Sequence, residues 1–147
     1  MMCTTYGSLI FHVVFSTKNR VPTIEPDLKT DLHAYLGGTI RGLGGIPFEV
    51  GGVEDHVHLA IALKPTHCLA DFVRELKKAS SSWGKDRIPG FAWQEGYAIF
   101  GLDAKGIAPL KLYIETQQVH HRKIGSKAEL LALCHEAGIE PEVRFFV

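Results

Sequence analysis

The 147-residue chain has no apolar run approaching the roughly 20 residues that a membrane-spanning helix needs. Its first residues, Met-Met-Cys-Thr-Thr-Tyr, lack the basic start and the cleavage site of a secretory signal peptide. These two absences predict a cytoplasmic protein without a membrane partner.

Cysteine is scarce as well. The chain has only Cys3, Cys68 and Cys134, which lie far apart and form no Cys-x-x-Cys pair. An odd number at such spacings argues against a disulfide framework and against a zinc ribbon. We therefore expect buried or free thiols.

The chain has no excess charge of either sign, because 16 lysines and arginines balance 16 aspartates and glutamates. Nothing therefore attracts the whole molecule to nucleic acid or to an anionic membrane, and any polyanion must be bound by a local patch. Internal repeats and low-complexity segments are also absent. The length fits a single domain over residues 1–147.

Hydrophobic periodicity predicts the elements in the order β-α-β-β-α-β-α-α. Alternation of apolar residues predicts four strands, at residues 7–17, 47–53, 56–63 and 91–100, and Gly51-Gly52 is a candidate bulge. Glu54-Asp55 is short enough to join the middle two in a hairpin. This order predicts the α+β class, with a ferredoxin-like antiparallel sheet, helices on one face and an appended C-terminal helix that bears a tyrosine.

Apolar residues spaced by three and four predict the helices. We expect them to open at Pro26 or Asp27, after a Thr66 cap, at Pro109, and at Ser126. Ser126 and Glu129 have the spacing of a capping box.

Two histidines, His56 and His58, enter the apolar third strand one residue apart. Residues at i and i+2 of a strand point to the same face, so the two imidazoles are expected to lie together, as on a metal site. With eight histidines in the chain, about 0.4 such pairs are expected by chance, so the pair alone is weak evidence.

The predicted helix after Pro109 carries a polar stripe of Tyr113, Gln117 and His120. One interpretation is a half-buried tyrosine with polar neighbours at its rim. The other combines the stripe with His56 and His58 as a nucleophile and three metal ligands, the third being Gln117. Tyrosine has a reference pKa of about 10, so it needs a phosphate that a divalent metal has already polarised.

Basic residues gather in two places, where they are either solvated or in contact with phosphate. Lys18 and Arg20 follow the first strand, and five more lie on and after the second helix, namely Arg74, Lys77, Lys78, Lys85 and Arg87. Near the end of that helix, Trp83 is a candidate platform for unpaired bases or a packing residue.

Several blocks together resemble the single-tyrosine HUH transposases, the enzymes of single-strand-transposing insertion sequences, and their relatives that act at repetitive extragenic palindromes. The blocks are His12-Val13-Val14-Phe15-Ser16-Thr17-Lys18-Asn19-Arg20, His56-Val57-His58, Phe91-Ala92-Trp93-Gln94-Glu95-Gly96-Tyr97, Tyr113-Ile114-x-x-Gln117-x-x-His120-His121-Arg122 and Gly138-Ile139-Glu140. The histidine pair alone is weakly specific, but the blocks in this order are strongly so.

This resemblance implies a transposase that cleaves and rejoins single-stranded DNA at hairpin-forming ends without nucleotide hydrolysis. Tyr113 would attack a DNA phosphate to give a 5′-phosphotyrosine, while His56, His58 and Gln117 would bind Mg²⁺ or Mn²⁺. It also implies a homodimer in which the tyrosine helix of one subunit serves the histidines of the other. Residues 101–106 are less serine-rich than expected before this helix.

Two other functions fit parts of the pattern. A ferredoxin-like nucleic-acid-binding module without cleavage activity would use the same sheet, but such modules stack bases on sheet aromatics, and here the exposed sheet face offers histidines. A hydrolase of small phosphate esters could use the same metal, but the chain has no visible phosphate-cradling loop.

Overall fold

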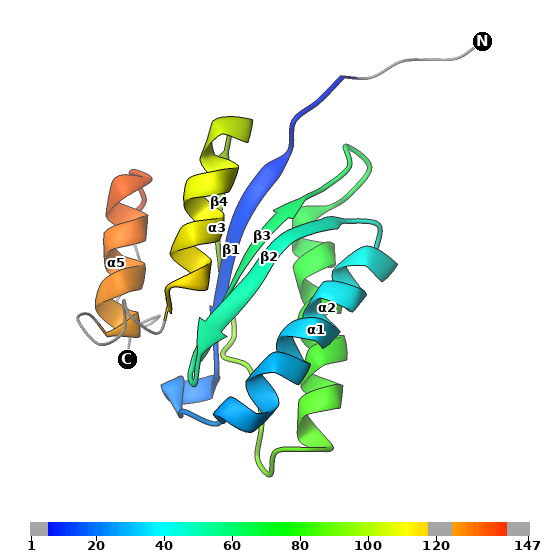
Figure 1. The fold of residues 1–147 in the computed structure, drawn as a ribbon, viewed down its shortest axis with the longest axis vertical. Helices are drawn as coiled ribbons and strands as arrows, with labels where there is room; N and C mark the ends of the chain where they lie inside the picture. The colour runs from blue at the N-terminus through cyan, green and yellow to red at the C-terminus, as the bar shows by residue number, and fades with distance from the viewer. Residues whose placement is uncertain (1–5, 118–124, 141–147) are drawn as a thin grey trace.

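The computed structural model describes residues 6–117 and 125–140. Its sheet has four antiparallel strands in the order β2-β3-β1-β4. The strands are β1 (Ile10–Ser16), β2 (Ile46–Val53), β3 (His56–Ala62) and β4 (Ala98–Leu102). The helices are α1 (Pro26–Gly42), α2 (Leu69–Lys85), α3 (Ile107–Glu115) and α5 (Ser126–Glu136), with short 3-10 turns η1 (Lys18–Arg20) and η2 (Ala104–Gly106). This arrangement confirms the predicted ferredoxin-like α+β class (Figure 1).

One face of the sheet forms the hydrophobic core with α1 and α2. The alternating residues of β1 and β3 that point to this face are fully or almost fully buried, namely Val13, Phe15, Val57, Leu59 and Ile61. The predicted stripes of the two helices meet them, including Leu32, Leu36 and Ile40 of α1 and Phe72, Val73 and Leu76 of α2. Each such buried side chain contributes roughly 1.5–3 kcal/mol, which holds the sheet against the two helices.

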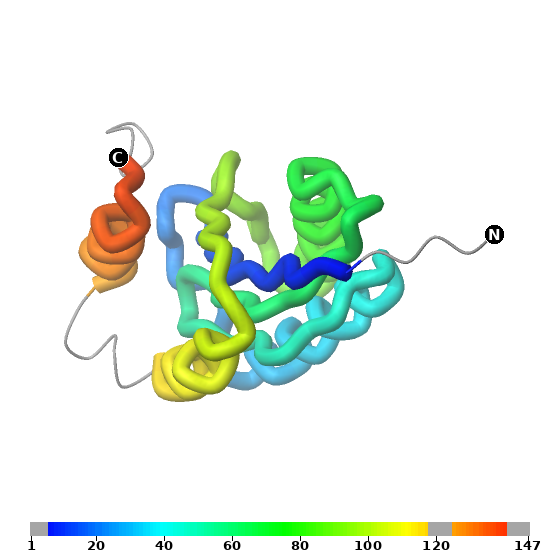
Figure 2. The backbone as a smooth tube through the Cα atoms, turned by 90° about the horizontal axis from the view of Figure 1, so that it is seen from above, coloured from blue at the N-terminus to red at the C-terminus, as the bar shows by residue number. Residues whose placement is uncertain are grey.

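The other face carries the histidines and is covered by α3 and α5 (Figures 1 and 2). In the antiparallel register, His58 pairs with Val14 and His56 with Ser16, so these side chains share that face. His56 and His58 are 2% and 0% exposed. The prediction that the histidines lie on an exposed sheet face is therefore wrong, whereas the two core helices on one face and the appended helices are as predicted. The appended helices cover the second face.

The segment Phe91–Phe100 is only in part a strand, because β4 begins at Ala98. Gly96 has a φ of 84°, which interrupts an extended strand. Lys77 donates hydrogen bonds of 2.7 Å to the carbonyl oxygens of Gln94 and Gly96, which holds this irregular segment on α2. The first strand is also shorter than predicted, since it spans Ile10–Ser16 instead of residues 7–17.

Several predicted boundaries shift. The cap of α2 is Cys68 instead of Thr66, and α3 begins at Ile107, before Pro109. The irregularity in β2 lies between Pro47 and Glu49, whereas the Gly51-Gly52 pair continues the ladder with β3. The hairpin through Glu54-Asp55 and the start of α1 at Pro26 are as predicted.

None of the helices in the described part of the chain is long and apolar enough to cross a membrane.

Gly51 allows α3 to lie directly on the sheet. It pairs with His58 across the β2–β3 ladder, and a Cβ atom there would lie 2.6 Å from Cγ2 and 3.0 Å from the carbonyl oxygen of Ile114. Such distances are too short for ordinary packing, so any side chain at this position pushes α3 away from the histidines. The glycine therefore fixes how closely Tyr113, the neighbour of Ile114, approaches the sheet.

The variant Gly51→Ala is expected to lower the free energy of unfolding by about 1–3 kcal/mol, because the added methyl group overlaps Ile114. Urea unfolding followed by circular dichroism measures this change. Gly38→Ala is a matched control, since nothing lies within 4 Å of its Cβ position in α1. It is expected to be neutral or stabilising by about 0.5–1 kcal/mol. Equal stability of Gly51→Ala and the wild type would contradict the close approach of α3.

Candidate metal and tyrosine site

The two histidines of β3 lie side by side near the start of the strand. Their ring centroids are 4.9 Å apart, and both side chains are buried beneath α3 and α5. This position confirms that His56 and His58 share one face of the sheet. It also removes them from bulk water, which strengthens their interactions with nearby charged groups.

Glu129 of α5 meets both histidines. Its Oε1 lies 2.8 Å from Nε2 of His58 and 3.3 Å from Nε2 of His56, and it is 5% exposed. One ligand atom from each of the three residues lies within 4.8 Å of the others. Two imidazole nitrogens and a carboxylate oxygen are a donor set that Mn²⁺, Mg²⁺ and related divalent ions accept. The residues present therefore fit a divalent metal.

The sequence did not reveal Glu129 as a member of this site. We predicted a capping box at Ser126 and Glu129, which is wrong, because the residue before the helix is Gly125 and it makes no side-chain cap. Instead, the Ser126 hydroxyl donates to Oδ2 of Asp55 at 3.1 Å. Residues three apart on a helix share a face, so the same spacing turns both side chains toward the histidines.

Each histidine has a partner on its other ring nitrogen. Nδ1 of His56 lies 2.6 Å from Oδ1 of Asp55, and Nδ1 of His58 lies 2.7 Å from Nε2 of His12. Such partners fix the ring orientation and the tautomer of a metal-binding histidine. His12 was part of the motif that carried the family resemblance, but its position opposite His58 follows only from the strand register.

The surroundings of the site shift the pKa values of His56 and His12 in opposite directions. Burial lowers the pKa of His56, but hydrogen bonds with Asp55 and Glu129 outweigh burial and raise this pKa to about 9. Burial, together with the neighbouring His58, lowers the pKa of His12 to about 3, so His12 is neutral at physiological pH. A cation that enters the site therefore replaces a proton on His56.

Tyr113 of α3 lies against the histidines of its own chain. Its ring centroid is 5.5 Å from that of His58 and 6.0 Å from that of His12, both in edge-on geometry. Burial raises the pKa of Tyr113, and a hydrogen bond between its hydroxyl group and Glu129 raises the pKa further. The tyrosine is therefore a neutral phenol in this arrangement, with its hydroxyl group directed at the carboxylate.

Gln117 lies just beyond the end of α3. The helix ends at Glu115, Thr116 forms a turn, and the Gln117 side chain is 1% exposed. Its amide nitrogen donates to the carbonyl oxygen of Tyr113 at 3.3 Å, and its side chain also hydrogen-bonds to the phenol, which lowers the pKa of Tyr113. Gln117 is thus beside the tyrosine at the site. His120, the third member of the predicted stripe, lies outside the described residues.

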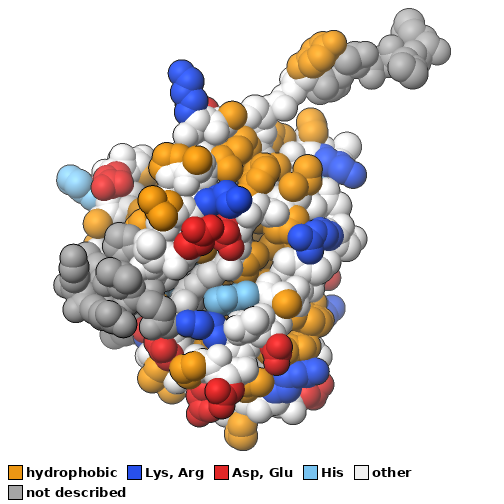
Figure 3. Space-filling view, in the orientation of Figure 1, with side chains coloured by type: hydrophobic (Ala, Val, Ile, Leu, Met, Phe, Trp, Pro, Cys, Tyr) orange, Lys and Arg blue, Asp and Glu red, His pale blue; other side chains and the backbone are white. Residues whose placement is uncertain are grey.

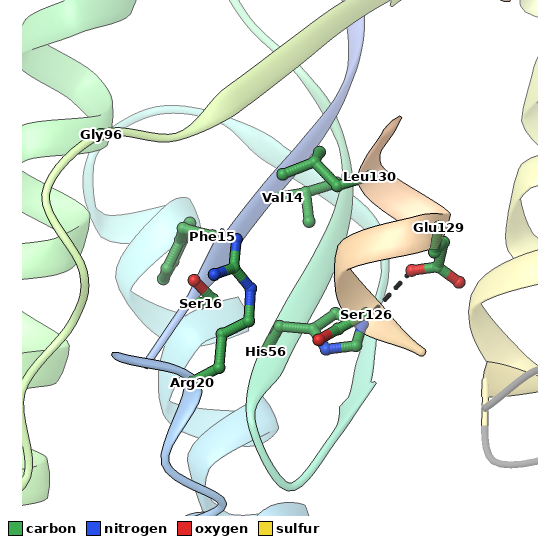
Figure 4. Close-up of a pocket in the computed structure, with 9 residues that line it drawn as sticks. All are labelled: Val14, Phe15, Ser16, Arg20, His56, Gly96, Ser126, Glu129 and Leu130. Atoms are coloured by element: carbon green, nitrogen blue, oxygen red, sulfur yellow. Dashed lines mark ion pairs between the residues drawn. The ribbon is translucent and has the colours of Figure 1, made fainter. Parts of the chain in front are cut away.

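A pocket opens beside His56. Its lining comes from β1, η1, β3, the segment before β4, and α5, namely Val14, Phe15, Ser16, Arg20, His56, Gly96, Ser126, Glu129 and Leu130. Figure 4 shows the side chain of Arg20 extending from η1 toward Ser16 of β1, with His56 of β3 beside it. Of the seven basic residues predicted to bind DNA, Arg20 is the one that lines this pocket, and its neighbour Lys18 is exposed on the same turn.

The basic residues of the second helix lie away from the histidines, because α2 covers the opposite face of the sheet. Arg74 pairs with Asp71 at 3.0 Å and with Glu75 at 3.6 Å. Lys77 is half-buried, and burial lowers its pKa to about 8. On the face drawn in Figure 3, side chains of both signs are interspersed instead of gathered into a basic patch.

Trp83 is a packing residue in this structure. Its ring stacks on Tyr35 of α1 with centroids 5.5 Å apart, and the guanidinium of Arg87 lies 4.3 Å above the ring. These contacts occupy the aromatic surface that was a candidate base platform. The remaining members of the predicted basic group, Lys78 and Lys85, are exposed on the same helix.

A ferredoxin-like sheet with a buried histidine pair beside a tyrosine-bearing helix is the arrangement expected of single-tyrosine HUH transposases. The chain belongs to this class, because the model of the family "Transposase IS200 like" matches residues 5–117. Members of this family are DNA-cleaving and DNA-transferring enzymes, and the family assignment confirms the resemblance seen in the sequence.

One relative is similar to this chain in sequence, and two solved structures are similar to it in fold. Over 124 residues, the chain is 28% identical to the ISDra2 transposase TnpA of Deinococcus radiodurans, covering 74% of this chain and 84% of the relative. The crystal structure of a protein from Deinococcus radiodurans R1, named there as a transposase, is similar in fold, with a TM-score of 0.63 at 23% identity. The match covers 80% of this chain and 96% of the chain in that crystal structure. The structure of a REP-associated tyrosine transposase bound to a REP hairpin has a TM-score of 0.60 at 15% identity. This match covers 96% of this chain and 89% of the transposase chain. At these identities the two structures establish a common fold.

The contact between His12 and His58 predicts an effect of His12 on metal binding. The variant His12→Phe is expected to weaken Mn²⁺ binding about 10- to 100-fold, because His58 loses the partner that orients its ring. Isothermal titration calorimetry with Mn²⁺ measures the affinity. His33→Phe is the matched control, since His33 is a half-buried histidine on α1, across the sheet from the site. An unchanged affinity of His12→Phe would show that His58 needs no such partner.

Proposed function

We propose that this protein is a metal-dependent DNA strand transferase that cleaves and rejoins single-stranded DNA through a 5′-phosphotyrosine at Tyr113. The observation that carries the proposal is the contact of one buried carboxylate with the histidine pair and with the tyrosine. Glu129 lies 2.8 Å and 3.3 Å from Nε2 of His58 and His56, and it accepts the hydrogen bond of the Tyr113 hydroxyl group. A nucleophile and a candidate metal site are thus adjacent.

The metal in this proposal is Mg²⁺ or Mn²⁺. His56 and His58 supply two nitrogen ligands, Glu129 supplies an oxygen from α5, and Gln117, our predicted third ligand, supplies an amide oxygen from its buried position beside Tyr113. When bound, such an ion polarises the scissile phosphate and neutralises charge that develops on it. Asp55 and His12 orient the two imidazoles through hydrogen bonds at Nδ1 of His56 and Nδ1 of His58.

The residues of the chain carry out the remaining work. The hydroxyl oxygen of Tyr113 attacks the phosphorus of a DNA phosphodiester, and its proton passes to Glu129, which already accepts the hydrogen bond. The bond from phosphorus to the 3′ oxygen breaks, and this oxygen takes up the proton that left Tyr113, so that a 5′-phosphotyrosine and a free 3′ hydroxyl group remain. Attack of a 3′ hydroxyl group on the phosphotyrosine reverses the step and joins strands, so no nucleotide cofactor is consumed.

The proposed partner is single-stranded DNA with hairpin-forming ends. The fold is similar to that of a tyrosine transposase that was solved with a REP hairpin bound. We also propose a homodimer, as the family resemblance implies. Tyr113 already meets the histidines of its own chain, so a subunit exchange of α3 would replace these contacts with equivalent ones from the partner.

A nucleic-acid-binding module without cleavage activity fits the structure less well. Such modules need an open sheet face on which bases stack. Here the face opposite the core is covered by α3 and α5, and the histidines on it are buried. The proposed enzyme instead uses this cover to enclose its reacting groups.

The variant Tyr113→Phe is expected to abolish covalent protein–DNA adducts, because it removes the attacking oxygen and leaves the ring in place. Wild-type and variant protein are incubated with a single-stranded hairpin DNA and Mn²⁺, and the fraction of protein bonded to DNA is quantified on a denaturing gel. Tyr97→Phe removes a hydroxyl group from a partly buried tyrosine that packs against the core, and it is the control. Adducts of Tyr113→Phe at the wild-type level would overturn the proposal.

Metal titration distinguishes the contributions of Glu129 and Gln117, the two proposed oxygen ligands, to Mn²⁺ affinity. Glu129→Ala is expected to weaken Mn²⁺ binding at least tenfold, and Gln117→Ala by a smaller factor, because a carboxylate contributes a full negative charge that an amide lacks. Glu136→Ala removes an exposed carboxylate from the same helix and serves as the control. Mn²⁺ binding by Glu129→Ala at the wild-type affinity would exclude Glu129 as a ligand.

A further inference from the structure

Arg20 reaches the pocket beside His56 from a turn with unusual backbone geometry. Asn19 and Arg20 both have positive φ angles, 56° and 54°. Residues other than glycine seldom adopt this left-handed conformation, which costs roughly 1–2 kcal/mol for each residue. Two such residues in succession persist only where the surrounding contacts hold them, and strain of this kind is concentrated at functional sites.

Hydrogen bonds fix this turn on both sides. The Thr17 hydroxyl group lies 2.7 Å from the carbonyl oxygen of Val21 and 3.1 Å from that of Asp55. On the other side, the amide nitrogen of Asn19 donates to Oε1 of Gln94 at 3.0 Å, and that of Lys18 donates to the carbonyl oxygen of Ala92 at 2.9 Å. The strained turn is therefore a rigid base for the Arg20 side chain.

The same anchor also orients His56. Asp55 accepts from the amide nitrogen of Thr17 at 2.8 Å through its backbone, and its carboxylate lies 2.6 Å from Nδ1 of His56. The turn that carries Arg20 and the ring of His56 are thus held by one residue. Because both side chains line one pocket, the Arg20 guanidinium is available beside the candidate metal ligand before DNA binds (Figure 4).

We propose that Arg20 binds the non-bridging oxygens of the scissile phosphate and stabilises its charge during attack by Tyr113. This inference rests on the proposed strand-transfer function. A guanidinium donates two parallel hydrogen bonds to phosphate oxygens, which a lysine cannot do, and a half-buried pocket strengthens both bonds. Lys18 is exposed on the same turn and does not line this pocket, so in this proposal it is a general phosphate contact only.

The distinction between the two roles is measurable. A group that only binds DNA changes the dissociation constant, whereas a group that acts on the scissile phosphate in the transition state changes the rate at saturating DNA. Loss of one preorganised donor to a developing charge typically costs 100- to 1,000-fold in rate. Arginine and alanine are equally strained at a φ of 54°, so Arg20→Ala leaves the backbone preference of the turn unchanged.

The test measures formation of the Tyr113 adduct in single turnovers, at saturating hairpin DNA and Mn²⁺, together with the dissociation constant for the DNA. Arg20→Ala is expected to lower the rate constant about 100-fold and to change DNA affinity less than threefold. Arg20→Lys is expected to recover only a small part of the rate, and added guanidinium ion to accelerate Arg20→Ala but not the wild type. Arg41→Ala, an exposed arginine at the far end of α1, is the matched control.

Three outcomes separate the proposals. A large rate loss with guanidinium rescue supports the role of Arg20. A wild-type rate constant for Arg20→Ala, or a loss confined to DNA affinity, overturns that role while the strand-transfer function stands. A wild-type protein that forms no adduct overturns the proposed function itself. A thermal unfolding curve of Arg20→Ala that matches the wild type ensures that a rate loss is not a folding defect.

Discussion

The contact of the Glu129 carboxylate with two imidazoles is the interaction on which this site depends. Placing charged groups out of water costs several kcal/mol for each ion unless each charge finds partners. Here Glu129 and Asp55 balance the charge on His56, and His12 completes the hydrogen bonding of His58. Only Glu129 and Cys134 are buried on α5 among its described residues, so polar contacts, more than apolar area, hold this helix against the sheet.

The sheet makes this contact possible because its two faces have different roles. Its core face, with α1 and α2, supplies the apolar burial that stabilises the fold, and its second face is available for chemistry. Gly51 brings α3 close enough for Tyr113 to meet His58, and the hairpin turn places Asp55 next to His56. The reacting groups therefore come from β1, β3, α3 and α5, segments that are distant along the chain.

Much of this arrangement could be predicted from the sequence. The period-2 and period-3.6 patterns gave the sheet and the core helices, and the spacing of His56 and His58 placed them on one face. Glu129 could not be found in this way, because its distance in the sequence from the histidines carries no signal and its spacing from Ser126 matched a capping box. Tertiary contacts also overrode local patterns at residues 91–97, where Lys77 binds carbonyl oxygens that a continuous strand would have used.

The central claim is that Tyr113 becomes covalently bonded to DNA. The chain has four tyrosines, Tyr6, Tyr35, Tyr97 and Tyr113, so the claim can be tested directly. Wild-type protein is incubated with single-stranded hairpin DNA and Mn²⁺, the DNA is trimmed with nuclease, and the peptides are mapped by mass spectrometry. The account predicts a nucleotide attached through phosphate to the peptide that contains Tyr113. A nucleotide on any other tyrosine, or none on Tyr113 when DNA is cleaved, would contradict it.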